Sequence, residues 1–329
     1  MRVLVTGGTG FVGAHTVKSL LDAGHEVKLL VRSAERVAAA LEPLGVVTPI
    51  SHVIGDVTDP ETVASALQGC QAVVHCASVY SNDPRRAKEV TSTNLASAET
   101  VLGQAVERGL DPVVHVSSIV ALLPAGKDVI SEDSDPGRGG PPYPASKQAQ
   151  ERYARKLQEQ GAPVVITYPG SVWGPHDPYD GESTKLARNF VRGLVPFRPM
   201  GGVAIVDVRD VAAGHAAVIE PGKGPRRFML GGHYTRTPDL VRIACSEAGV
   251  RRPGIPIPST IAYVSGQVLA PFQRIAPFRL PIDPGSTWTV RCDVRVDNGR
   301  AERELGINFR PTAETIRDQV AWQKAAGRL

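Results

Sequence analysis

A tyrosine and a lysine stand four residues apart in the segment GGPPYPASKQAQE, residues 139–151. Positions i and i+4 share one face of a helix, so we expect Lys147 beside Tyr143. A free phenol has a pKa near ~10, and a cation held close stabilises the phenolate and lowers that pKa. Tyr143 could then act as a general acid for a carbonyl or a general base for an alcohol. Pro144 is tolerated because it falls in the first helical turn.

Such chemistry needs a third group, a hydroxyl that holds the substrate oxygen. The segment VVHVSSIVAL offers Ser117 and Ser118 at the end of a predicted strand, residues 112–118. Open parallel sheets place their sites at the carboxyl ends of strands. The sequence therefore offers Ser117 and Ser118 as candidates for the third catalytic side chain.

A glycine-rich turn near the start of the chain indicates a phosphate-binding loop. In VLVTGGTGFVG, Gly7, Gly10 and Gly13 follow a predicted strand and open a predicted helix. Glycines allow the tight turn and a close approach of the backbone, and the helix N-terminus offers N–H donors to a pyrophosphate. A tight turn without a ligand is the alternative, but the strand–turn–helix context favours a dinucleotide.

The end of the second strand selects between the two nicotinamide cofactors. NAD-binding proteins usually have an acidic residue there, but this chain has Val31, followed by Arg32 and, one turn later, Arg36. An arginine can bind a 2′-phosphate through paired charged hydrogen bonds, so NADPH is favoured and NADH remains the alternative. Arg36 could instead be a solvated helix residue. Asp56 and Val57 are placed to meet the adenine, although Asp56 could simply cap its loop.

The elements that must position these residues follow a regular alternation. Short apolar strands are expected at 2–6, 26–31, 52–56, 72–78, 112–118 and 163–169, separated by helices. This pattern predicts an α/β fold: a Rossmann, doubly wound parallel sheet with a smaller C-terminal substrate domain. Residues 1–172 and 207–232 would form the nucleotide-binding domain, and residues 173–206 and 233–329 the substrate-binding domain.

Composition narrows the class further. The 329 residues carry a net charge of +4 with scattered basic residues, so we expect no nucleic-acid partner. The four cysteines, at 70, 76, 245 and 292, lack metal-type spacing, so no metal site is expected, and reduced thiols indicate a cytoplasmic protein. Because the residues MRVLVTGG already begin the first predicted strand and glycine turn, we expect no signal peptide. The apolar stretch 261–272 is too short and too interrupted to span a bilayer. We expect it to be core, with a lid or a membrane-facing patch as the alternatives.

Together these motifs resemble the extended short-chain dehydrogenase/reductase superfamily, over roughly residues 1–232. The segments that carry the resemblance are TGGTGFVG, GDVTD, HCAS, NLAS, VSS, YPASK, YPGSVWGP and VDVRDVAAGHAA. The resemblance implies a nicotinamide cofactor and a catalytic set of Ser118, Tyr143, Lys147 and Asn94. Asn94 would distort its helix and hold a water; a solvated polar residue is the alternative. Many members dimerise through two helices each, and the helices expected at 86–108 and 145–160 could form such a homodimer.

The residues expected around the cofactor come from several loops. In the family, the lysine also orients the nicotinamide ribose, and the strand end read here as YPGSV backs the nicotinamide. The predicted cofactor-binding residues are Gly7, Gly10, Phe11, Val12, Gly13, Arg32, Arg36, Asp56, Val57, Cys76, Ala77, Ser78, Ser117, Tyr143, Lys147, Pro169, Gly170 and Val172.

Departures from the family pattern indicate the branch. Sugar-nucleotide dehydratases usually carry an Asp-Glu pair where this chain has Ile119 and Val120, and epimerases favour the acid missing at Val31. The chain therefore resembles the dihydroflavonol-4-reductase-like and 3β-hydroxysteroid-dehydrogenase-like branch. That resemblance implies NADPH-dependent reduction of a ketone or aldehyde on a bulky, mostly apolar small molecule, or oxidation of the matching alcohol. Alternatives are an NAD-linked hydroxysteroid-type dehydrogenase, a sugar-nucleotide epimerase, or a dinucleotide-binding sensor without turnover.

The substrate side is less well defined. Residues 175–190 and 194–202 are expected to wall the pocket, with Val195, Phe197 and Met200 as apolar contacts. His176 and Tyr179 are candidate polar contacts, although a loop histidine is usually solvated. His215 is expected to be structural.

Overall fold

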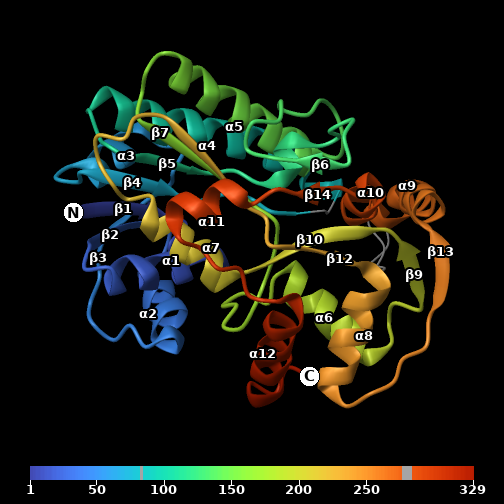
Figure 1. The fold of residues 1–329 in the computed structure, drawn as a ribbon. Helices are drawn as coiled ribbons and strands as arrows, with labels where there is room; N and C mark the ends of the chain where they lie inside the picture. The colour runs from blue at the N-terminus through green and yellow to red at the C-terminus, as the bar shows by residue number, and fades with distance from the viewer. Residues whose placement is uncertain (82–83, 276–283) are drawn as a thin grey trace.

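The computed structural model describes residues 1–81, 84–275 and 284–329. Within these residues, seven parallel strands form the central sheet, in the order β11-β7-β5-β4-β1-β2-β3 (Figure 1). The strands are β1 (Arg2–Thr6), β2 (Glu26–Val31), β3 (Ser51–Ile54), β4 (Ala72–His75), β5 (Val113–Val116), β7 (Val164–Pro169) and β11 (Arg226–Leu230). The middle strands β4, β5 and β7 are rich in Val and Ile and are buried on both faces, which confirms the predicted doubly wound sheet.

Helices cover both faces of this sheet. On one face, α1 and α7 pack together, and Val17 and Val211 share a core cluster with Val5 of β1. On the other, α4 packs along α5, and Val101 and Ala154 share a second cluster. The helical segments of this part are α1 (Phe11–Asp22), α2 (Glu35–Leu41), η1 (Glu42–Leu44), α3 (Pro60–Leu67), η2 (Pro84–Arg86), α4 (Ala87–Glu107), η3 (Ile119–Leu122), α5 (Pro142–Glu159) and α7 (Val208–Ala217).

Most of the remaining elements gather at the carboxyl-end side of the sheet, below and to the right in Figure 1, whereas residues 299–305 lie back against β11 and α7. They have a core cluster of their own, which includes Trp173, Phe190 and Ile316. The strands are β8 (Ser171–Trp173), β10 (Gly202–Asp207) and β12 (His233–Arg236) in one sheet, β9 (Phe197–Met200) with β13 (Ile255–Pro258), and β6 (Val129–Ile130) with β14 (Arg295–Val296). The helices are α6 (Glu182–Arg192), α8 (Thr237–Ala248), α9 (Ser259–Ile275), α10 (Pro284–Cys292), α11 (Gly299–Leu305) and α12 (Thr312–Ala325).

The chain returns to the first sheet near its end. Ala301 of α11 and the following Ile307 and Phe309 belong to the same core cluster as β1 and α7. The assignment of all of residues 233–329 to a separate substrate-binding domain therefore stays a prediction.

The apolar stretch 261–272 forms most of helix α9, but its placement in the core was wrong. Ala262 is buried, whereas Ile261, Val264 and Val268 are 55%, 52% and 70% exposed. These three residues lie on one face of the helix because they are three and four positions apart. Among the described residues, no helix is both long enough and apolar enough to cross a bilayer.

Candidate active site at the carboxyl ends of the sheet

The glycine turn joins β1 to α1 and leaves no space for larger residues. Gly7 has a φ of +69°, and a Cβ there would lie 2.7 Å from the backbone nitrogen of Ala77. A Cβ at Gly13 would overlap the carbonyl oxygen of Gly7. Gly10, the N-cap of α1, has no side chain to occupy the free N–H groups of the first turn, which begins with Phe11 and Val12. The turn therefore has the close backbone approach and open helix N-terminus that a pyrophosphate requires.

Two arginines follow β2, one directly after the strand and one in α2. Val31 is buried, and Arg32 and Arg36 are exposed. The Arg36 guanidinium lies 5.5 Å from the ring centroid of Tyr179, so it has a protein partner as well as solvent. Arg32 lies close enough to Asp56 to contribute to that residue's lowered pKa.

Asp56 caps its own loop. Its carboxylate accepts hydrogen bonds from the Thr58 hydroxyl at 2.7 Å and the Thr58 backbone at 2.9 Å. These bonds, and to a smaller degree Arg32, lower the pKa of Asp56. The neighbouring Val57 packs against the second core cluster. Contact of either residue with an adenine remains a prediction.

The end of β4 approaches the glycine turn from the other side. The backbone nitrogen of Ala77 donates to the Thr6 hydroxyl at 3.3 Å, while Ser78 is exposed. Burial raises the pKa of the Cys76 thiol to about 12, so this cysteine stays protonated and is a packing residue rather than a nucleophile.

Asn94 is completely buried in α4 and ties together three segments. Its amide accepts from Val79 N at 2.7 Å and donates to Val79 O at 3.1 Å and to the Ser146 hydroxyl at 3.0 Å. The alternative of a solvated residue is therefore wrong. The family resemblance implies that Asn94 distorts its helix. Helix α4 nevertheless runs from Ala87 to Glu107 without a break. Asn94 holds the end of β4 against the first turns of α5.

Tyr143 and Lys147 lie one turn apart at the start of α5, which begins at Pro142 rather than at residue 145. Lys147 is only 3% exposed, and its ammonium group donates to the carbonyl oxygen of Val116 at 3.0 Å. Burial lowers the pKa of Lys147 to about 8, and the nearby Glu151 carboxylate opposes that shift.

The predicted lowering of the Tyr143 pKa is not seen in this structure. The Tyr143 ring meets the Tyr80 ring edge to face, with centroids 4.5 Å apart. Burial raises the pKa of Tyr143 above its ordinary value, because an ionised phenol would lose its hydration. The protonated Tyr143 is in the form needed to donate a proton.

The two serines after β5 point to different neighbours. Ser118 is the N-cap of η3; this serine is partly exposed, and its hydroxyl lies 3.5 Å from the carbonyl oxygen of Pro169. Ser117 is buried, and its hydroxyl donates to the Glu151 carboxylate at 2.8 Å. Ser118 is thus the more accessible of the two serines, whereas the Ser117 side chain is committed to the protein interior.

Sequence reasoning missed Glu151, which joins the site to the sheet. Its fully buried carboxylate accepts hydrogen bonds from Ser117, from the Tyr168 hydroxyl at 2.6 Å and from Arg155 at 2.6 Å. The available signal was its position four residues after Lys147, on the same helix face. A buried carboxylate with three donors fixes α5 against β5 and β7.

The segment after β7 is shaped by another close approach. A Cβ at Gly170 would lie within 2.7 Å of the carbonyl oxygen of Ala204, and Pro169 and Val172 flank this glycine in β7 and β8. The backbone therefore turns tightly beside Ser118. This placement is consistent with the predicted wall behind a nicotinamide.

The predicted substrate-side residues do not converge on one pocket. Val195 packs against the core cluster that includes Trp173 and Phe190, and Phe197 and Met200 are 40% and 49% exposed. Tyr179 is the partner of Arg36, and His176 lies 6.0 Å from the Trp322 ring. His215 is fully buried between the Thr16 and Thr167 hydroxyls, as expected for a structural histidine.

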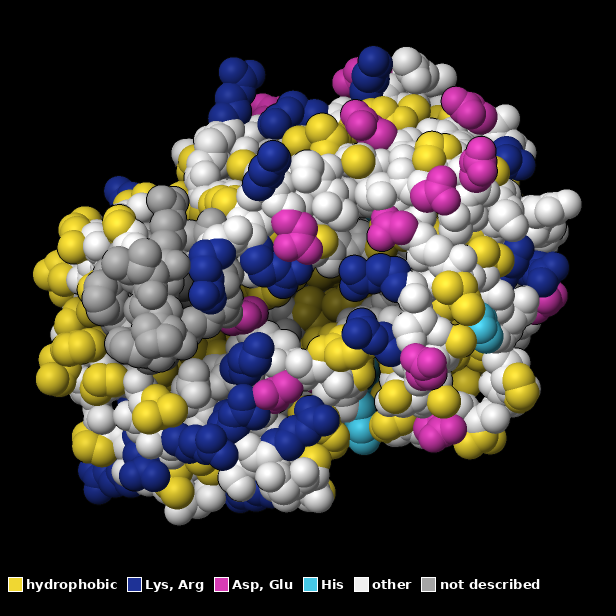
Figure 2. Space-filling view, turned by 180° about the vertical axis from the view of Figure 1, so that it is seen from behind, with side chains coloured by type: hydrophobic (Ala, Val, Ile, Leu, Met, Phe, Trp, Pro, Cys, Tyr) yellow, Lys and Arg dark blue, Asp and Glu magenta, His cyan; other side chains and the backbone are white. Residues whose placement is uncertain are grey.

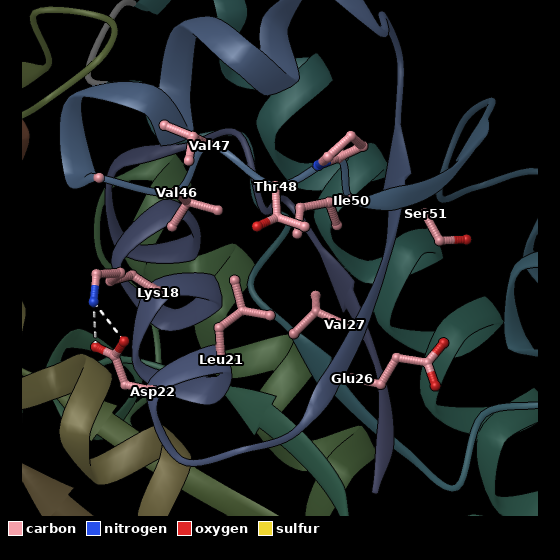
Figure 3. Close-up of a pocket in the computed structure, with 12 residues that line it drawn as sticks. Lys18, Leu21, Asp22, Glu26, Val27, Val46, Val47, Thr48, Ile50 and Ser51 are labelled. Carbon is pink, nitrogen blue, oxygen red and sulfur yellow. Dashed lines mark hydrogen bonds and ion pairs between the residues drawn. The ribbon is translucent and has the colours of Figure 1, made fainter.

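The surface has a central hollow, and a separate pocket lies elsewhere. Figure 2 shows the hollow near the centre of the face that it draws, with hydrophobic side chains inside and side chains of both charges around it. An open pocket of about 430 Å³ lies instead at the start of β2 and β3, between Leu21, Val27 and Ile50 (Figure 3). It is at the opposite ends of the strands from Tyr143, so it is not part of the candidate active site.

Comparison with known proteins agrees with this geometry. The family model described as NAD dependent epimerase/dehydratase matches residues 3–231. A Synechocystis protein, provisionally named a dihydroflavonol 4-reductase, is 30% identical, with 97% of this chain and 93% of that protein covered. Sterol demethylase protein B of Methylococcus capsulatus is 27% identical over the full length of both chains. A Stigmatella aurantiaca ketoreductase of a farnesyl-bearing dihydroquinoline oxide is 26% identical, covering 99% and 98%.

Solved structures show the same fold. The crystal structure of gox2253 superposes with a TM-score of 0.80 at 26% identity and covers 100% of this chain and 99% of that one. A UDP-glucose 4-epimerase from Bifidobacterium longum, in complex with NAD+ and UDP, has a TM-score of 0.76 at 22% identity, with the same coverage.

Proposed function

Because the chain belongs to the NAD dependent epimerase/dehydratase family, whose members are NAD(P)-dependent enzymes of alcohol and carbonyl groups, we propose that it is an NADPH-dependent carbonyl reductase. Its substrate would be a ketone or aldehyde on a bulky, mostly apolar molecule. The observation that supports the proposal is that buried Lys147, one helical turn after Tyr143, donates to Val116 at the end of the strand that Ser118 follows.

The residues fit a nicotinamide dinucleotide. The glycine turn offers its backbone and the N-terminus of α1 to the pyrophosphate, and Arg32 offers a guanidinium to a 2′-phosphate. When bound, the reduced nicotinamide supplies a hydride to the carbonyl carbon. Val31 in place of an acid supports NADPH over NADH, because a carboxylate would repel the phosphate.

Three side chains of the protein would bind and protonate the carbonyl oxygen of the substrate. Ser118 would donate a hydrogen bond to the carbonyl oxygen and hold it near Tyr143. Tyr143, protonated at neutral pH, would give its proton to that oxygen as negative charge develops there. Lys147, held in place by Val116, would stabilise the phenolate that remains.

The names of the relatives support an apolar substrate class. The sterol and farnesyl-dihydroquinoline names both describe bulky, mostly apolar molecules. Ile119 and Val120 cannot carry out the acid–base steps of a dehydratase, because neither side chain titrates.

The test is a substrate screen with both cofactors. Purified protein is mixed with NADPH or NADH and a panel of bulky ketones and aldehydes, and loss of reduced-nicotinamide absorbance is followed. NADPH-dependent turnover of at least one apolar carbonyl supports the proposal. Turnover with NADH alone would favour a hydroxysteroid-type dehydrogenase, and epimerisation of a sugar nucleotide without net cofactor use would favour an epimerase. Tight cofactor binding without any turnover would favour a sensor.

A further inference from the structure

Helix α9 carries an apolar face that points to solvent. Ile261, Val264 and Val268 are each more than half exposed and lie along one side of the helix. A surface helix normally turns such residues toward the core and presents polar residues outward. Here the opposite side already packs inward, through the buried Ala262 and through Tyr263, which packs against the second core cluster, as Tyr143 does.

The neighbouring two-stranded sheet extends this apolar surface. Phe197 of β9 and Ile255 of β13 are register partners, and they are 40% and 59% exposed. In-register partners of parallel strands project to the same side of a sheet, so these two side chains lie next to each other. Figure 2 shows hydrophobic side chains gathered along its left edge, the edge that carries α9, β9 and β13 in Figure 1. We call these five residues of α9, β9 and β13 the apolar edge.

The segments that build the apolar edge are basic. Residues 183–206 and 251–275 contain seven Lys and Arg residues and no Asp or Glu, although the whole chain carries 33 acidic residues. Arg192, Arg251 and Arg252 are exposed, and the last two immediately precede β13. Asp293 lies beyond the far end of β9 and accepts hydrogen bonds from Gly202 N and the Tyr234 hydroxyl. An exposed aliphatic surface with a cationic border is complementary to a layer of anionic headgroups over hydrocarbon.

We infer that the apolar edge docks onto the surface of a membrane that contains anionic lipids. The apolar edge inserts at the level of the headgroups, Arg251 and Arg252 contact lipid phosphates, and the chain lies on the bilayer without crossing it. Docking does not depend on the proposed reductase function. If that function also holds, the membrane is a source of apolar substrate next to α9, which packs through Tyr263 against the same core cluster as Tyr143.

The experiment is cosedimentation with vesicles of phosphatidylcholine alone and of equal parts phosphatidylcholine and phosphatidylglycerol. We expect binding to the anionic vesicles to be tighter by roughly tenfold or more, and to weaken with added salt. The triple variant Ile261→Gln, Val264→Gln, Val268→Gln should lose about tenfold or more of that binding, because it removes the inserting side chains. Arg251→Gln with Arg252→Gln should remove the preference for anionic vesicles.

The matched control is Val47→Gln with Ile54→Gln, which changes exposed apolar residues of the nucleotide-binding half, 82% and 62% exposed. This control should bind vesicles as the unchanged protein does. If the triple variant does not fold, the single change Val268→Gln at the most exposed position of the face replaces it. Absence of vesicle binding by the folded, unchanged protein, or full binding by the triple variant, would overturn the inference. A concentration-dependent dimer that the triple variant abolishes, without vesicle binding, would instead assign the apolar edge to contact between copies.

Discussion

Lys147 is 3% exposed, and its ammonium group donates a hydrogen bond to the carbonyl oxygen of Val116. Burial lowers its pKa to about 8, which is close to the range in which enzymes work. The lysine is therefore a cation below about pH 8 and becomes neutral as the pH rises above that value. Only the cation can stabilise a Tyr143 phenolate.

The resulting prediction concerns pH. We expect kcat/KM for carbonyl reduction to be highest below the Lys147 pKa and to fall as the pH rises through about 8. A steady-state pH profile of the purified protein checks this, with NADPH binding measured at each pH as the control. A profile that stays level well above that pH, with binding intact, would show that the charge on Lys147 is not needed.

The choice of cofactor is also decided by single residues. Arg32→Ala should weaken NADPH binding by about 10- to 100-fold, because a charged hydrogen bond contributes ~1.5–3 kcal/mol, and should leave NADH binding nearly unchanged. Side-by-side fluorescence titrations of both cofactors provide the measurement. Arg242→Ala, which removes an exposed arginine from α8, is the matched control. Equal losses for both cofactors in Arg32→Ala would contradict a role in binding the 2′-phosphate.

At the scale of the elements, α5 is held to the sheet by one buried carboxylate. Glu151 accepts hydrogen bonds from Ser117, Tyr168 and Arg155, which belong to the end of β5, to β7 and to α5. Glu151→Ala leaves the Arg155 charge partly buried and without this partner, so we expect a loss of about 3–5 kcal/mol in the free energy of unfolding.

Chemical denaturation checks the effect of Glu151→Ala. Glu89→Ala, which removes an exposed carboxylate paired with Arg86 on α4, is the control and should cost less than about 1 kcal/mol. If the two variants were equally stable, the buried network would not be what fixes α5.

Much of the arrangement of strands and helices could be predicted from the sequence. The strands at 2–6 and 26–31 have the expected bounds, because short Val- and Leu-rich runs between glycines and helices are typical of parallel sheets. Helix α5 starts earlier than expected, at Pro142, since proline is favoured in a first helical turn. The Glu151 network could not be predicted, because two of its three donors, Ser117 and Tyr168, come from other elements far along the chain.

At the scale of the whole molecule, the candidate site is built from many segments. Four segments of the first 160 residues lie at the carboxyl ends of the parallel strands: the glycine turn, the end of β4, the end of β5 and the start of α5. The alternation of strands and helices predicted this meeting point. The sequence did not reveal that α9 exposes its apolar face, because periodicity marks two sides of a helix without saying which side another element covers.

A ligand that bridges several segments should stabilise the folded chain as a whole. NADPH at about 100 times its Kd should raise the free energy of unfolding by about 2.7 kcal/mol, with the Tm rising further as its concentration increases. Thermal unfolding at several NADPH concentrations measures this effect, and the Arg32→Ala variant should need more NADPH for the same rise. A Tm that does not respond to NADPH or NADH would contradict a dinucleotide site at the glycine turn.

The central claim is that Tyr143 protonates the carbonyl oxygen, and the most direct test compares the unchanged protein with Tyr143→Phe. The variant keeps the ring that packs against Tyr80 and removes only the hydroxyl. Turnover of a ketone found in the substrate screen is measured alongside NADPH binding. We predict that kcat falls by about 10²- to 10⁴-fold while NADPH binding stays within about twofold. Near-normal turnover by Tyr143→Phe would contradict the proposed mechanism.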